Sequence, residues 1–156
     1  AVAYYVKLTA ERLAPFPAEL KMVAGNPTAR RAQNRALVSW ACGGIGALPR
    51  HATVPACSED EALELRVVFP GCWNGRTADS ANHKRHLAYP TRARCPASHP
   101  VAVPTLILVL LYPPVPKGAF PSSGRFAAHA DFMNGWDVDA LAGFVAGLNA
   151  AQPSYP

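Results

Sequence analysis

The sequence predicts a mainly β, disulfide-stapled domain, an antiparallel sandwich or jelly roll with one C-terminal helix. Pro (16) and Gly (11) are frequent among the 156 residues, which favours short elements joined by turns. Several short runs rich in Val, Leu and Tyr are bounded by Gly, Pro or Asn, as strands are. Half of the residues are hydrophobic, so a chain of this length can build one core.

The strands are expected where apolar runs stand between turn signals. The second run, "ELKMVAGNP", ends in the turn signal Gly25-Asn26-Pro27. The run from Leu63 to Phe69 begins with the alternation of a half-buried strand, whereas "TLILVLLYP" is continuously aliphatic and predicts a central strand buried on both faces. The expected strands are 1–8, 19–27, 36–42, 63–69, 105–113 and 126–133.

The C-terminal part carries the one clear helix signal. Asp137 is a suitable N-cap. The apolar residues that follow are spaced at i, i+3, i+4 and i+7, which predicts an amphipathic helix whose stripe packs on the sheet; they are Leu141, Phe144, Val145 and Leu148. We therefore expect a single β-rich domain over residues 1–150 and an unstructured tail over 151–156.

The four cysteines suit two disulfides. Each stands beside turn residues and none forms a CxxC pair, which argues against a zinc site made of cysteines alone. Sequential pairing, Cys42 with Cys57 and Cys72 with Cys95, is the simplest of three connectivities. Disulfides persist in oxidising compartments, so this interpretation predicts a secreted, extracellular protein.

Charge and hydropathy exclude several functions. The net charge of +5 comes with an arginine cluster at Arg30, Arg31 and Arg35 and a second basic group between residues 76 and 94. Neither has the aromatic interleaving of a nucleic-acid-binding module, so we interpret both as solvated surface and expect no nucleic-acid partner. The longest apolar run is broken by Pro104 and predicts no membrane span. Nucleophile elbows, phosphate loops and dinucleotide fingerprints are missing from the sequence.

Residues 69–90, "FPGCWNGRTADSANHKRHLAYP", hold many polar side chains and almost no aliphatic residue. A segment that buries little apolar surface must be held by something else or have a function. The Cys72 bridge would supply half of that support. His83 and His86, three apart, could converge on a metal if they lie on a helical turn. The alternative is that both are loop residues bonded to backbone carbonyls.

The segment "HADFMNGWD" offers a second group of candidates. On a strand, His129, Asp131 and Met133 share one face, opposite Phe132. If Phe132 belongs to the core, the histidine and the carboxylate line a cleft as base and orienter, as metal ligands, or as partners for a sugar hydroxyl. The alternative is that Asp131 caps a turn that leads into the helix.

These segments together, with "LKMVAGNPTA" and "CPASHPVAVPTLILVLLYP", resemble the C-terminal part of the domain-of-unknown-function family nineteen ninety-six, over roughly residues 4 to 148. The resemblance implies a secreted protein of the kind found in fungi and bacteria, sometimes beside carbohydrate-binding modules. Members carry an upstream His-x-His-x-Phe-Phe-Gly motif, which this sequence lacks, so we expect a separate chain or segment to complete any joint site. The family supplies no activity to carry over.

We therefore predict a carbohydrate-active protein that binds or cleaves an extracellular polysaccharide, as a hydrolase or lyase, without a cofactor. The predicted acid, base and substrate-placing residues are Asp79, His83, His86, Tyr89 and Asp131. The predicted sugar contacts are Trp73, Asn74, His99, His129, Asn134 and Trp136, because aromatic faces stack on sugar rings while polar groups bind their hydroxyls. One alternative is a non-catalytic glycan-binding or cell-surface module. Another is a zinc or copper protein with His83, His86 and His129 as ligands.

Overall fold

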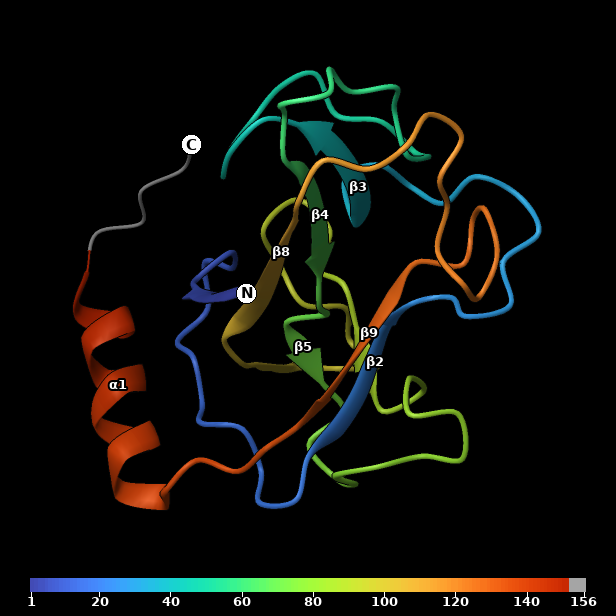
Figure 1. Cartoon of the computed structure of the whole chain (residues 1–156). Helices are drawn as coiled ribbons and strands as arrows, with labels where there is room; N and C mark the ends of the chain where they lie inside the picture. The colour runs from blue at the N-terminus through green and yellow to red at the C-terminus, as the bar shows by residue number, and fades with distance from the viewer. Residues whose placement is uncertain (152–156) are drawn as a thin grey trace. The chain divides into compact units, whose positions relative to one another are not determined.

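The computed structural model describes residues 1–151 and confirms the predicted class (Figure 1). The chain is mainly β with antiparallel sheets, one C-terminal helix and two disulfides. The elements are β1 Val2–Val6, β2 Lys21–Gly25, β3 Val38–Cys42, β4 Leu63–Val68, β5 Cys72–Trp73, β6 Leu87–Ala88, β7 Val101–Ala102, β8 Thr105–Tyr112, β9 His129–Met133 and α1 Val138–Ala150. No helix in this described part is both long and apolar enough to cross a bilayer.

Three sheets contain all nine strands of the described residues. The largest has the strand order β1-β8-β4-β3, the second pairs β2 with β9, and the third has the order β6-β5-β7. In the largest sheet Val67 on β4 stands opposite both Val38 and Leu108. As predicted, β8 is an inner strand, but it is not buried on both faces along its length. Thr105, Leu106 and Val109 are buried, whereas Leu111 and Tyr112 at its end are exposed.

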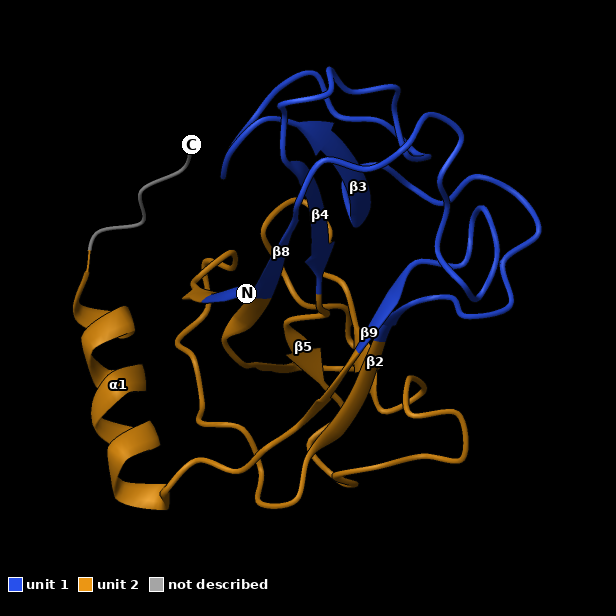
Figure 2. Ribbon diagram, viewed as in Figure 1, with its two compact units in different colours: residues 1–3, 24–68, 107–130 blue, residues 4–23, 69–106, 131–156 orange. Residues whose placement is uncertain are grey.

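The chain divides into two compact units (Figure 2). The first unit comprises residues 1–3, 24–68 and 107–130, and the second comprises 4–23, 69–106 and 131–156. The predicted pairing of the cysteines is confirmed, with Cys42–Cys57 in the first unit and Cys72–Cys95 in the second. The single-domain expectation over 1–150 stays a prediction. Of the predicted tail, residues 152–156 lie outside the described residues.

In the first unit, the alternation of β3 and β4 separates an apolar face from a polar one. Trp40 pairs with Leu65, and both are buried. Ser39 pairs with Arg66 on the opposite face. Glu64 lies on this same face, because it is two residues from Arg66 on β4. Glu64 is fully buried, so this unit encloses a charge as well as a hydrophobic core.

In the second unit, aromatic rings form the core beside the helix. Phe132 packs against Phe16 and Phe69, with ring centroids 5.5 and 6.4 Å away. Helix α1 buries Leu141 and Val145, two members of the predicted stripe. Its start is fixed as predicted, because Asp137 accepts hydrogen bonds from the first free backbone amides of the helix, those of residues 139 and 140.

Three short strands around the second disulfide had no counterpart in the sequence-based prediction. Strands β5, β6 and β7 contain two residues each. Two residues carry no periodicity, so a strand of this length leaves no pattern to detect. These strands matter to the site, because they anchor both ends of the polar segment 74–86.

Candidate functional site

Strand β2 brings the polar segment and the end of β9 together within the second unit. The backbone N–H groups of Lys21 and Val23 donate to the carbonyl oxygens of Ala78 and His83, both at 3.0 Å. Strand β2 also pairs with β9. Because alternate backbone groups of a strand point to opposite edges, one edge of β2 holds the segment and the other holds β9, which carries Asp131.

The polar segment is ordered largely by its own side chains. Ser80 Oγ lies 2.9 Å from His86 Nδ1 and accepts a hydrogen bond from the Arg85 N–H at 3.1 Å. Asn82 Oδ1 accepts from the backbone N–H groups of Lys84 and Arg85. Such local bonds to the backbone are what Ser and Asn supply in turns. They replace the apolar burial that this segment lacks.

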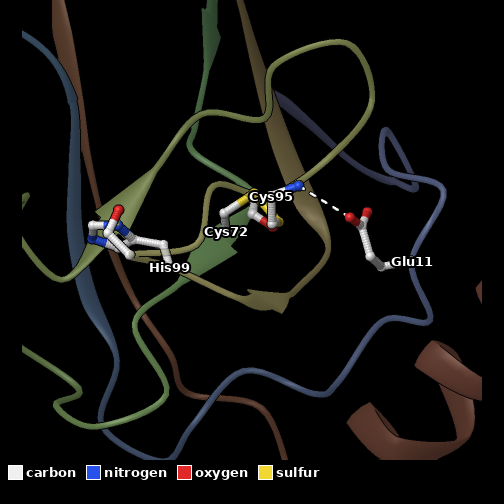
Figure 3. Close-up of a disulfide and its surroundings, with 6 residues drawn as sticks. Glu11, Cys72, Cys95 and His99 are labelled. Carbon is white, nitrogen blue, oxygen red and sulfur yellow. Dashed lines mark hydrogen bonds between the residues drawn. A yellow bond between two sulfur atoms is a disulfide. The ribbon is translucent and has the colours of Figure 1, made fainter.

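The second disulfide fixes the base of this segment (Figure 3). Cys72 lies on β5, and its partner Cys95 is held from another side by Glu11, whose Oε1 accepts from the Cys95 N–H at 3.2 Å. His99 Nδ1 lies 2.9 Å from Ser98 Oγ, and its Nε2 lies 3.0 Å from the Arg85 carbonyl oxygen. His99, a predicted sugar contact, therefore braces the end of the polar segment.

Asp79 and His83 form a close hydrogen-bonded pair at the surface. Asp79 Oδ1 lies 2.6 Å from His83 Nδ1, and the two side chains are 35% and 48% exposed. The hydrogen bond from His83 is the main reason that the pKa of Asp79 lies below its usual value. His83 has a left-handed backbone with φ of 53°, an uncommon conformation for a non-glycine residue. It aims the imidazole back at the carboxylate four residues earlier.

His83 borders a hollow of about 160 Å³ on this surface. The lining residues come from β2, the polar segment and β9: Lys21, Met22, Val23, His83, Asp131, Phe132 and Met133. Asp131 and Met133 are exposed while Phe132 packs into the aromatic core. The predicted alternation of β9 is thus present, and the hollow joins Asp131 to the Asp79–His83 pair.

Of two other predicted acid or base residues, His86 is buried and Tyr89 is partly buried. His86 is buried with Nδ1 at Ser80. Burial lowers the pKa of His86, and the backbone of Lys21 opposes this by less, so the imidazole is neutral near pH 7. Burial raises the pKa of Tyr89 to about 12, so its phenol stays protonated and can donate a hydrogen bond but cannot act as a phenolate base.

Three of the predicted sugar contacts, Trp73, Asn74 and Asn134, hold the local backbone instead. Trp73 Nε1 donates to the Thr77 carbonyl oxygen at 2.7 Å, and Asn74 Oδ1 accepts from the Arg76 and Thr77 N–H groups. Asn134 Nδ2 donates to the Pro17 carbonyl oxygen at 3.1 Å. None of these three side chains lines the hollow.

Trp136 and His129 do not line the hollow either. Trp136 stacks on Phe144 of α1 and donates through Nε1 to the Tyr5 hydroxyl at 3.2 Å. His129 belongs to the first unit, where its Nδ1 lies 2.9 Å from the Ala127 carbonyl oxygen. Among residues 1–151, no three His, Cys, Asp or Glu side chains are grouped so that they could hold a metal ion, so the zinc or copper alternative has no ligand set there.

Lys21, Val23 and Lys84 are neighbours of the site that sequence reasoning missed. Lys21 and Val23 line the hollow. Burial lowers the pKa of Lys84, and the charge of Asp131 opposes that shift, which places this ammonium in the field of the carboxylate. The sequence held no signal for this grouping, because it depends on the long-range pairing of β2 with the polar segment and β9.

One comparison with known proteins identifies the family. The family model described as Domain of unknown function (DUF1996) matches residues 1–136, a range that includes β1 to β9 and every predicted site residue. No curated protein and no solved structure matches the chain. The match covers most of the sequence, and the chain belongs to the DUF1996 family.

Proposed function

We propose that this chain is part of a secreted protein that binds an extracellular polysaccharide and cleaves it at the hollow between β2, β9 and the polar segment. The observation that carries the proposal is the Asp79–His83 pair, 2.6 Å apart and partly exposed, beside a hollow that also holds Asp131. The two disulfides support an oxidising compartment.

His83 is the proton-transfer group in this proposal. With Nδ1 bonded to the Asp79 carboxylate, the favoured neutral tautomer carries its proton on Nδ1, so Nε2 can accept a proton from a ligand. The carboxylate orients the ring and stabilises the imidazolium that forms, which makes Asp79 a positioning residue. Asp131, which lines the same hollow, supplies the second acid–base group beside His83.

The cations beside the hollow suit an acidic sugar. Lys21 lines the hollow, and Lys84 lies in the field of Asp131. Their ammonium groups could offset the carboxylate of a uronate while His83 removes the proton on C5. The bond from C4 to the glycosidic oxygen then breaks, a double bond forms between C4 and C5, and the leaving oxygen takes a proton from solvent. A hydrolase would instead use the pair to activate water. Hydrolysis yields new reducing ends alone, whereas elimination also yields unsaturated ends, so the products distinguish the two.

The test compares the chain with a His83→Asn variant on a panel of neutral and acidic polysaccharides. Asn tolerates the left-handed backbone at this position, so the variant removes the imidazole while keeping the loop. We expect the loss of about 10²-fold or more in cleavage rate that removal of a general base causes. His51→Asn is the matched control, because the hydrogen bonds of His51 to Trp40 use backbone atoms alone. Equal rates for the chain and His83→Asn would contradict the proposal.

A second candidate function is glycan binding without cleavage, which the exposed Trp136 favours. Trp136 is 39% exposed and lies nearly parallel to Phe144, with an interplanar angle of 16° and a centroid distance of 5.8 Å. A sugar can stack on a tryptophan held in this way. Under this alternative, Trp136→Leu weakens binding to the polysaccharide, His83→Asn leaves it unchanged, and neither protein releases products.

A further inference from the structure

The first unit contains a second hollow that the proposed function does not use. It is wide and open, with a volume of about 610 Å³. Its lining comes from two turns, one before β3 and one that returns to the edge of β3: Arg35, Ala36, Leu48, Pro49 and Arg50. Two of these five residues are arginines, and none of the described residues in the lining is acidic.

The guanidinium group of Arg50 is held in place by Glu64 and Ser39. Its Nη2 lies 2.8 Å from Glu64 Oε1, and its Nη1 lies 3.4 Å from Ser39 Oγ. Glu64 is fully buried, and its other oxygen accepts from the Gly46 N–H at 2.8 Å. A guanidinium fixed by a buried carboxylate loses little side-chain entropy when a ligand binds.

Arg35 lies over the same turn. Its Nη1 is 3.5 Å from the backbone oxygen of Arg50, and both side chains line the hollow. The contact is long and uses one nitrogen of the Arg35 guanidinium, so the group can still bind a ligand. The five N–H groups of a guanidinium match the oxygens of a carboxylate or sulfate, often in pairs. Two guanidinium groups on one hollow can therefore hold a single oxyanion between them.

The charges around Arg50 are unbalanced. Arg66 lies on the same face of β4 as Glu64. Burial is the main cause that lowers the pKa of Arg66, and the charge of Arg50 lowers it further. Arg50 and Arg66 thus lie in the field of one carboxylate, that of Glu64, and Arg35 adds a further positive charge to the hollow that Arg50 lines. A bound anion would reduce the repulsion that this excess creates.

The other wall of the hollow is apolar. Leu48 is 78% exposed, and Ala36 and Pro49 complete the lining. An apolar surface beside guanidinium groups suits a ligand that joins an anionic group to a ring with C–H bonds, as an acidic sugar does. An inorganic anion would use the arginines and leave Leu48 in water.

We propose that the hollow between Arg35 and Arg50 is an oxyanion-binding site that takes the carboxylate or sulfate group of an acidic sugar. The oxyanion part rests on the arginines and Glu64 alone, whereas the sugar part rests on the proposed function. If no anion binds there, these arginines are ordinary solvated surface, and the titration below distinguishes the two cases.

The experiment is calorimetric titration of the chain with sodium sulfate, trigalacturonate and a neutral galactose trimer, at constant ionic strength. We expect saturable binding of sulfate, tighter binding of trigalacturonate, and none of the neutral trimer. Arg35→Gln should weaken both anions about tenfold, the worth of a charge-assisted hydrogen bond. Arg30→Gln is the matched control, since it removes the same charge from an exposed arginine outside the hollow, and it should change the affinity less than twofold.

Each result decides one part of the proposal. Equal weakening by Arg35→Gln and Arg30→Gln would mean diffuse attraction to a basic surface and would overturn the site, as would the absence of saturable binding. Sulfate binding with no gain for trigalacturonate would overturn the sugar part. Repeating the titrations on His83→Asn separates the two proposals, because that change lies in the other unit and should leave this binding intact even where cleavage is lost.

Discussion

His83 Nδ1 lies 2.6 Å from Asp79 Oδ1, four residues earlier in the chain, and the imidazole of His83 borders a hollow that also contains Asp131. Three features place this pair: the left-handed backbone at His83, the hydrogen bond from Val23 to the His83 carbonyl, and the side-chain bonds of Ser80 and Asn82. An imidazole oriented by a carboxylate can move protons.

Asp79→Asn should lower the cleavage rate while leaving the fold intact. The amide cannot stabilise an imidazolium and can turn His83 to the wrong tautomer, for which we expect a loss of about 10²-fold to 10⁴-fold. The exposed carboxylate adds little to the core, so the melting temperature should stay within a few degrees. Steady-state kinetics and thermal melts check this, and full activity in Asp79→Asn would show that the pair is only structural.

Cys72→Ser should destabilise the second unit and loosen the polar segment. Loss of a native disulfide typically costs about 2 to 5 kcal/mol. The Cys72–Cys95 bridge spans 23 residues and the Cys42–Cys57 bridge 15, so the chain-entropy term differs by only about 0.4 kcal/mol. Cys42→Ser is therefore the matched control. Hydrogen exchange of residues 78–86 should rise in Cys72→Ser alone, and equal exchange in both variants would contradict the clamping role.

His86 should make the fold sensitive to mild acid. Burial is the main cause that lowers the pKa of His86 in the folded chain, the charge of Asp79 raises it, and the charges of His83 and His99 lower it. A depressed folded pKa means that the unfolded chain binds the proton more readily. Stability from this group is therefore complete above the unfolded pKa of about 6.5 and falls as the pH drops below it.

Denaturant unfolding between pH 8 and pH 5 checks the role of His86. The free energy of unfolding should fall across this range in the chain, and the His86→Gln variant should lose part of that slope while being less stable at pH 8. His51→Gln serves as the control. An identical pH slope in the chain and His86→Gln would mean that other groups cause the acid sensitivity.

Glu64→Gln should be far more destabilising than its conservative chemistry suggests. The change leaves the guanidinium of Arg50 without its countercharge. The Arg50 side chain is only 18% exposed, and the side chain of its partner Glu64 is fully buried. Breaking one side of a buried pair costs about 3 to 5 kcal/mol. Glu59→Gln removes the same charge from an exposed position and should shift the free energy of unfolding by less than about 0.5 kcal/mol. Similar values for both variants would remove the support that Arg50 gives to the proposed oxyanion site.

Local pattern was enough to predict most of the framework. The apolar runs at β2, β3, β4, β8 and β9 and the N-cap Asp137 of α1 are signals that neighbouring residues create, so they could be found without the fold. The cysteine pairing is the sequential one, the simplest of the three connectivities, as predicted. The phase of β9 also followed from sequence, because side chains alternate along a strand and Phe132 marks its buried face.

The sequence determined which polar residues stand in the segment 69–90 and on β9, but only the tertiary structure decided which of them meet. Backbone hydrogen bonds from Lys21 and Val23 bring His83 beside Asp131, and the same folding turns His86, His99 and Asn74 into supports for the loop. The charged cluster of Glu64, Arg50 and Arg66 likewise arises when a turn folds back over β3 and β4. Contacts between residues far apart in the chain depend on strand pairing and burial, and no local pattern records them.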